Sequence, residues 1–175
     1  MKIIAHRGNL NGPKPQFEND PGYLLEAMDA GFCVEVDLWL SEGKNQEEKL
    51  LHFGHDKPQY RVNSEFFEKR EYDPLERIYF HCKNLQAMLF CHVVNVADTF
   101  GSGCKFFTHD KDPYTLVSDG SIWTYPDPDN ELSSLSIPVV YDRHSTWNFD
   151  KLKSCEGICT DDALYFDALF NGTAI

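Results

Sequence analysis

The stretch Phe32-Cys33-Val34-Glu35-Val36-Asp37-Leu38-Trp39-Leu40 decides the expected fold. Side chains alternate along a strand, so its even-numbered positions form one apolar face, while Glu35 and Asp37 share the other. In a closed barrel, helices cover the outer face of the strands, and this face is apolar. Polar side chains on a barrel strand therefore point inward, near the mouth. The alternative for this segment taken alone is an ordinary half-exposed strand with its charges in water.

Further apolar runs recur at short, fairly even intervals along the chain. They predict strands over residues 2–5, 49–53, 77–82, 104–108, 121–125, 137–141 and 157–160. Helical patterns cover residues 22–30, 83–91 and, more weakly, 64–70. We therefore expect a single α/β domain over residues 1–175: a compact TIM-type (β/α)8 barrel with several outer helices shortened or missing. The length is below the typical barrel of about 250 residues, which leaves a smaller open α/β sheet as the competing fold.

The composition limits the classes of partner. Lys and Arg sum to 16 against 28 Asp and Glu, so the net charge is -12. This charge disfavours nucleic acids and anionic membranes, whereas surplus carboxylates suit a divalent cation. No run reaches the roughly 20 apolar residues of a transmembrane helix, and the charged start lacks the apolar core of a secretory signal. The six cysteines form no CxxC pair. We expect reduced thiols in a cytoplasmic protein.

Ionisable residues follow the ends of several predicted strands. His6 and Arg7 end the first strand, His55 follows the third, and His81 and Lys83 share a face of the fourth. In a barrel these ends would form a charged ring at the catalytic mouth.

The residue types in this ring indicate phosphate-ester chemistry. Glu35 and Asp37, about 7 Å apart at Cα, can both reach one hard cation, for which Mg²⁺ or Ca²⁺ is the natural choice. Imidazole groups exchange protons readily near neutral pH, so one of His6 and His55 can accept a proton while the other donates one. The cations Arg7 and Lys83 suit the non-bridging oxygens of a phosphate. Together these groups predict cleavage of a small-molecule phosphodiester.

Other histidines and aromatic residues have weaker roles. His52 lies on the opposite strand face from His55 and is interpreted as structural, while His109 and His144 are candidates for the rim. Trp123 could pack against the alcohol portion of a substrate, although aromatic residues at such positions more often belong to the core.

Several motifs, taken in order, resemble the glycerophosphodiester phosphodiesterase family. They are His6-Arg7-Gly8, Glu18-Asn19, Ala30-Gly31 leading into Val34-Glu35-Val36-Asp37, His55-Asp56, and the final segment Glu156-Gly157-Ile158-Cys159-Thr160-Asp161. The resemblance implies a TIM barrel and metal-dependent hydrolysis of glycerophosphodiesters to an alcohol and glycerol phosphate.

The resemblance also implies a role for each matching residue. By the family pattern, His6 and His55 are the acid–base pair, and Arg7 contacts phosphate. Glu35 and Asp37 would hold the metal. Glu18 and Asn19 would brace or line the site.

The chain departs from the family pattern on the fourth predicted strand. The family has a Glu-x-Lys there, with the Glu as third metal ligand, whereas this chain has His81-Cys82-Lys83. Imidazole suits Zn²⁺ or Mn²⁺ better than Ca²⁺, so the metal preference has moved, the metal is held more weakly, or His81 is not a ligand. The alternatives are phospholipase C-like or sugar phosphodiester cleavage on the same barrel, and a non-catalytic barrel that binds phosphate esters.

Overall fold

The computed structural model describes residues 1–43, 49–97 and 103–173, and a parallel layer of strands forms its centre. Four of these strands lie side by side in chain order, and the C-terminal strand of the layer lies next to its N-terminal strand. Their spatial order is β10 (Gly157–Thr160), β1 (Lys2–His6), β2 (Cys33–Glu42), β5 (Ile78–Cys82) and β6 (Lys105–Phe107). Each strand pairs in parallel with its neighbour, so their carboxyl ends lie at one edge.

A hairpin extends this sheet beyond the parallel layer. Strand β3 (Lys49–Phe53) pairs antiparallel with β2, and β4 (Tyr60–Val62) pairs antiparallel with β3. A parallel return to the same sheet needs a crossover of a dozen or more residues, and the link over residues 43–48 is too short for one. The third predicted strand therefore exists but runs in the opposite direction to the one a (β/α)8 barrel requires.

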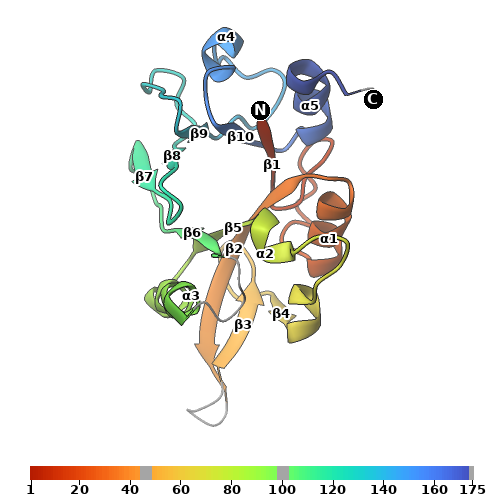
Figure 1. Cartoon of the computed structure of the whole chain (residues 1–175), viewed down its shortest axis with the longest axis vertical. Helices are drawn as coiled ribbons and strands as arrows, with labels where there is room; N and C mark the ends of the chain where they lie inside the picture. Colours follow the sequence, from red (N-terminus) through yellow and green to blue (C-terminus); the bar gives the residue numbers. More distant parts are fainter. Residues whose placement is uncertain (44–48, 98–102, 174–175) are drawn as a thin grey trace.

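The remaining strands form a second sheet of their own. It contains β7 (Tyr114–Leu116), β8 (Ile122–Thr124) and β9 (Ser136–Pro138), with β7 and β8 antiparallel. A single bridge between Val139 and Cys159 joins it to β10, and no ladder joins β6 to it within the described residues. Figure 1 shows the two sheets around a common interior, with β3 and β4 projecting away from it. The prediction of a (β/α)8 barrel is therefore wrong, because the strands form two mixed sheets that do not close.

Helices cover only part of the outside, which also differs from a (β/α)8 barrel. The predicted helix 22–30 is α1 (Pro21–Asp29), capped by the Asp20 side chain, which accepts hydrogen bonds from the backbone N–H groups of Gly22 and Tyr23. The prediction 83–91 corresponds to α3 (Leu85–Ala97), and residues 64–70 give only the 3₁₀ turn η1 (Ser64–Phe67). Three helices had no prediction: α2 (Pro74–Arg77), α4 (Phe149–Leu152) and α5 (Ala163–Asn171).

The alternation along β2 separates two layers of buried residues. Val34, Val36 and Leu38 face outward and are buried in the larger hydrophobic cluster with residues of α1, α3 and α5. The opposite face carries Glu35 and Asp37, which are 2 % and 0 % exposed. The interior of the molecule therefore contains carboxylates that must be satisfied by polar or charged partners. No helix within the described ranges is long and apolar enough to cross a bilayer.

Candidate functional site

Parallel register brings the predicted site residues to one edge of the sheet. His6 of β1 lies opposite Glu35 of β2, and Asp37 of β2 lies opposite His81 of β5. Lys83 follows β5 directly, and its backbone N–H bonds the Leu38 carbonyl. Residues that are 29 and 44 positions apart in sequence therefore become lateral neighbours through backbone pairing.

Glu35, Asp37 and His81 form a compact set of potential metal ligands. Each offers one ligand atom, and the three atoms lie within 4.8 Å of one another. His81 Nδ1 is 3.1 Å from Asp37 Oδ1 and 3.6 Å from Glu35 Oε1. Asp37 Oδ1 and Glu35 Oε2 are buried and, within the part of the chain that the structure describes, lack an aligned hydrogen-bond donor. Buried carboxylate oxygens without an aligned donor are uncommon, and the position of these two is suitable for binding a cation.

The other nitrogen of His81 supports the same interpretation. Its Nε2 lies 3.0 Å from the backbone carbonyl of His109, which fixes the proton on Nε2 in the neutral ring. This leaves the Nδ1 lone pair directed toward the two carboxylates. Metal-bound histidines usually donate their second N–H to a carbonyl or carboxylate in this manner. The donor set therefore fits a divalent cation with mixed nitrogen and oxygen ligands, such as Zn²⁺ or Mn²⁺.

Without a cation in place, positively charged side chains surround Asp37. Arg7 Nε lies 3.0 Å from Asp37 Oδ2, and Lys83 Nζ lies 3.4 Å from Asp37 Oδ1. Burial would raise the pKa of Asp37, but the nearby His55, His81 and Arg7 outweigh this and hold its pKa well below the usual range. Burial opposes the protonation of His81, yet Asp37 and Glu35 raise its pKa to about 9. An imidazolium at His81, together with Arg7 and Lys83, thus balances the two carboxylates at neutral pH.

A strained connection after β1 holds Arg7 in place. Arg7 and Asn19 both have positive φ angles, 51° and 65°, which non-glycine residues rarely adopt. The Asn19 side chain donates to Asp37 Oδ2 and accepts from the Asp37 backbone N–H, both at 3.0 Å. Glu18 Oε2 lies 3.1 Å from Arg7 Nη1. Such strain persists where surrounding contacts over-determine the backbone, and it clusters at functional sites.

The two proposed acid–base histidines have different surroundings. His6 has a side chain 12 % exposed, with Nδ1 2.9 Å from Asp161 Oδ1 and Nε2 3.8 Å from Glu35 Oε2. Burial disfavours its protonation, but Asp161 and Glu35 raise the pKa of His6 overall. His55 is 46 % exposed, and its Nδ1 lies 2.7 Å from Arg7 Nη2 and 3.3 Å from Asp37 Oδ2. One imidazole is thus held inside and the other stands at the entrance.

His55 reaches the site because β3 runs antiparallel. The strand returns along β2 so that Phe53 lies opposite Leu38, and the Gly54 N–H bonds the Asp37 carbonyl. The side chain that follows is therefore next to Asp37. The same reversal that excludes the barrel places this histidine where the motif analysis expected it.

Most of the sequence-predicted residues meet in one place, and one lies elsewhere. The structure brings together His6, Arg7, Glu18, Asn19, Glu35, Asp37, His55, His81 and Lys83. Trp123 is instead 3 % exposed and stacked on Phe107, with ring centroids 4.4 Å apart. It packs in the interior below the site, so nothing exposes its ring to the alcohol portion of a substrate.

Two residues that hold the site together had no predicted role, although Asp161 ends the last of the quoted motifs. Asp161 orients His6, and the Asn9 amide bonds both Asp161 Oδ1 at 2.7 Å and Glu18 Oε1 at 3.0 Å. Asp161 follows β10 directly, so its position at a strand end was the available signal. Asn9 comes two residues after Arg7, and no spacing rule identifies it.

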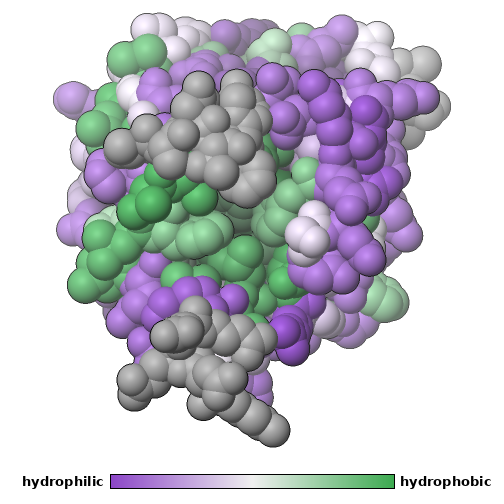
Figure 2. All heavy atoms as spheres, turned by 60° about the horizontal axis from the view of Figure 1, so that its bottom comes forward, coloured by the Kyte–Doolittle hydropathy of each residue, from purple (hydrophilic) through white to green (hydrophobic). Residues whose placement is uncertain are grey.

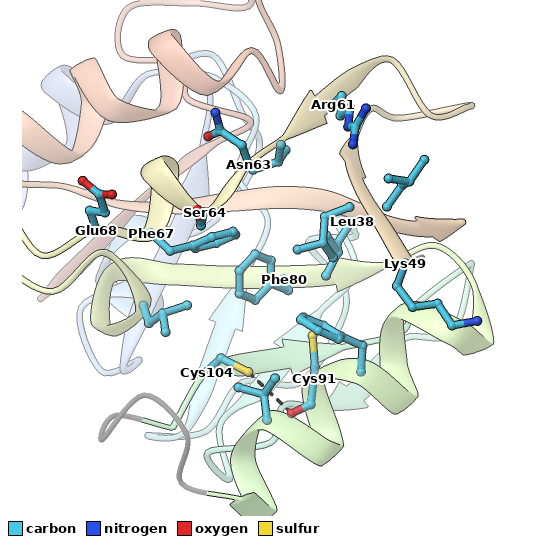
Figure 3. A pocket seen from close by; sticks show the side chains of 16 residues that line it. Leu38, Lys49, Arg61, Asn63, Ser64, Phe67, Glu68, Phe80, Cys91 and Cys104 are labelled. Carbon is cyan, nitrogen blue, oxygen red and sulfur yellow. Dashed lines mark hydrogen bonds between the residues drawn. The ribbon is translucent and has the colours of Figure 1, made fainter. Parts of the chain in front are cut away.

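An apolar cavity lies on the other face of the sheet from these charges. It has a volume of about 490 Å³ and is bordered by β2 to β5 and α3. Figure 3 shows Leu38, Phe67 and Phe80 directed into it, with Lys49 and Arg61 at its edge. Figure 2 views this side and shows hydrophobic residues gathered in a hollow. Leu38 and Phe80 alternate with Asp37 and His81, so the sheet separates this cavity from the charged site.

A second cavity, of about 320 Å³, lies beside His6. Tyr141 borders it, and the ring centroids of Tyr141 and His6 are 5.7 Å apart.

No protein-family model, curated protein or solved structure matches this chain. The evidence for a function therefore comes from the geometry of the charged site and from the sequence motifs.

Proposed function

We propose that this protein is a metal-dependent phosphodiester hydrolase acting on glycerophosphodiester-like small molecules. The observation that carries the proposal is the meeting of Glu35, Asp37 and His81 with two buried carboxylate oxygens that lack aligned donors. When bound there, a divalent cation supplies positive charge against the developing charge of the phosphoryl oxygens.

The chain's own cations would hold the phosphate next to this cluster. Arg7 carries five N–H donors, and its contacts with Glu18, Asp37 and His55 fix its orientation while leaving donors for phosphate oxygens. Lys83 Nζ, on the other side of Asp37, adds a second positive charge. Both side chains are 17 % exposed, so a bound phosphate would be shielded from most of the solvent.

The two imidazoles would move the protons of the reaction. One of His6 and His55 takes a proton from the attacking hydroxyl, and the other returns a proton to the departing alkoxide at its oxygen. The hydrogen bond with Asp161 fixes the ring of His6, and the contact with Arg7 fixes the ring of His55. Two groups with opposite protonation requirements predict a bell-shaped dependence of kcat/KM on pH.

A metal titration with an aryl diester tests this function. Protein treated with chelator is assayed on bis(p-nitrophenyl) phosphate with Mg²⁺, Ca²⁺, Mn²⁺ or Zn²⁺ added. We expect restored hydrolysis, with His6→Ala and His55→Ala each lowering kcat by about 10²–10⁴-fold. His92→Ala is the matched control, since His92 is exposed on α3. Full activity in excess chelator, or parental rates in both alanine variants, would refute the proposal.

One observation favours a second function, the binding of a phosphate ester without cleavage. A protonated His81, together with Arg7 and Lys83, already offsets the charges of Glu35 and Asp37, so the charged site is stable in the absence of a metal. A non-catalytic protein would bind a phosphate ester through Arg7 and Lys83 and show no turnover with any of the four cations. Calorimetry with glycerol phosphate beside the aryl diester assay separates the two functions.

A further inference from the structure

The 320 Å³ cavity is placed to receive the part of a substrate that projects past His6. Its border residue Tyr141 accepts the Asp161 N–H at its backbone oxygen, at 2.9 Å, and Asp161 in turn holds His6 Nδ1 at 2.9 Å. The Tyr141 ring is 48 % exposed and lines the cavity, and its centroid lies 5.7 Å from that of the His6 ring. A group bound in this cavity would therefore be next to the proposed acid–base residue.

The cavity has one apolar wall. Pro126 and Pro128 come from the loop after β8, and Val139 and Trp147 lie behind them. The Trp147 indole N–H is already bonded to the Val139 carbonyl at 3.2 Å, so this ring offers apolar surface only. Together with the Tyr141 ring, these residues can pack against the C–H face of a flat ligand.

The rest of the lining is polar and comes from the turn after β9. Asp142, His144 and Thr146 all line it, and His144 and Thr146 are exposed. Asp142 Oδ1 accepts the His144 N–H at 2.7 Å, which fixes the carboxylate. Its Oδ2 has no recorded partner among the described residues and is an acceptor for a ligand hydroxyl.

We propose that this cavity binds a pyranose-type sugar as the alcohol portion of the diester, an inference that deepens the proposed function and rests on it. A pyranose has an apolar C–H face and a rim of hydroxyl groups that both donate and accept, which matches the apolar and polar parts of the lining. The volume is at the small end of ligand cavities and suits a single ring.

Other alcohols fit the cavity less well. A long acyl chain would bury Asp142 without a hydrogen-bond partner, which is costly. A quaternary ammonium would be attracted by Asp142 but would give Thr146 no partner. Binding of a quaternary ammonium, probed with choline, is therefore the alternative outcome of the test.

Binding is measured without relying on turnover. Saturation-transfer NMR is recorded with methyl α-D-glucopyranoside, glycerol and choline, each with the full chain. We expect transfer to the ring protons of the glucoside, and at least a fivefold weaker signal in Tyr141→Ala and in Thr146→Val. Thr173→Val, an exposed residue after α5, is the matched control. Absence of transfer to the glucoside, or a stronger choline signal that Asp142→Asn removes, would overturn the inference.

A kinetic arm separates this inference from the proposed function. Methyl α-D-glucopyranoside is added to the bis(p-nitrophenyl) phosphate assay, and we expect it to inhibit competitively and more strongly than glycerol. Hydrolysis that is insensitive to the glucoside overturns the sugar site while leaving the hydrolase intact. Glucoside binding in a protein that hydrolyses no diester with any cation supports the sugar site and removes the hydrolase proposal.

Discussion

Replacing Asp37 by asparagine tests whether the charge of this residue holds the site together. The side chain is 0 % exposed and lies within 3.4 Å of charged nitrogens on Arg7, His81 and Lys83. Asparagine has nearly the same shape, so Asp37→Asn removes the charge with little change in packing. It leaves partly buried cations facing one another with Glu35 and Glu18 as the nearby carboxylates that offset them.

The expected cost follows from the burial of these groups. Removing one partner of a buried ion pair costs about 3–5 kcal/mol. Arg7 and Lys83 are each 17 % exposed, so water compensates them in part, and we expect the lower value, about 3 kcal/mol. For a chain of this size, that loss corresponds to a fall in Tm of about 6–12 °C.

Urea unfolding followed by circular dichroism, with chelator present, measures this difference. The matched control is Asp56→Asn, because Asp56 is 91 % exposed although its Oδ1 lies 3.6 Å from His55. We expect this control to stay within about 0.5 kcal/mol of the parent. A free energy of unfolding for Asp37→Asn equal to or above that of the parent would refute the view that Asp37 is the electrostatic centre of the site.

Three further changes have expected outcomes. Gly54→Ala should lower the free energy of unfolding by about 1–3 kcal/mol in urea titration, because Gly54 has a φ of 148° and a Cβ there would meet the Lys57 carbonyl; an unchanged midpoint would contradict this. Arg143 holds the pKa of Asp162 below its usual 3.8 despite burial, so this carboxylate stabilises the protein above that pH and the stabilisation is lost as pH falls through the lower folded-state value. Urea midpoints below pH 4 should therefore fall less steeply in Asp162→Asn, and parallel curves would contradict the assignment. His81→Glu should increase the rise in Tm produced by Ca²⁺ or Mg²⁺ and decrease that produced by Zn²⁺, and the same ranking of metals in both proteins would exclude His81 as a ligand.

The fold was predictable strand by strand but not in its topology. The alternation in β2 and the apolar runs of β1, β3 and β10 appear where the sequence pattern placed them. Apolar periodicity is the same for parallel and antiparallel strands, so it did not reveal that β3 turns back along β2. The short link over residues 43–48 carried that information, because a parallel crossover needs more chain. The strands β4 and β7 span only Tyr60–Val62 and Tyr114–Leu116, which is too short for periodicity to detect.

The candidate site was more predictable than the fold. Motifs at strand ends identified the carboxylates, both histidines and both cations, and the parallel pairing of β1, β2 and β5 is sufficient to bring most of them together. No role was predicted for Asp161 and Asn9, because their importance comes from contacts with each other across 152 residues.

The sequence by itself determined which side chains are available and which strand face they share, because alternation along a strand is a local property of the backbone. Tertiary structure alone decided that the two sheets stay open and that His81 faces both carboxylates through Nδ1 while His109 holds its other nitrogen. These features depend on pairings between distant segments. Such pairings are selected by the packing and charge balance of the whole chain rather than by any one stretch of residues.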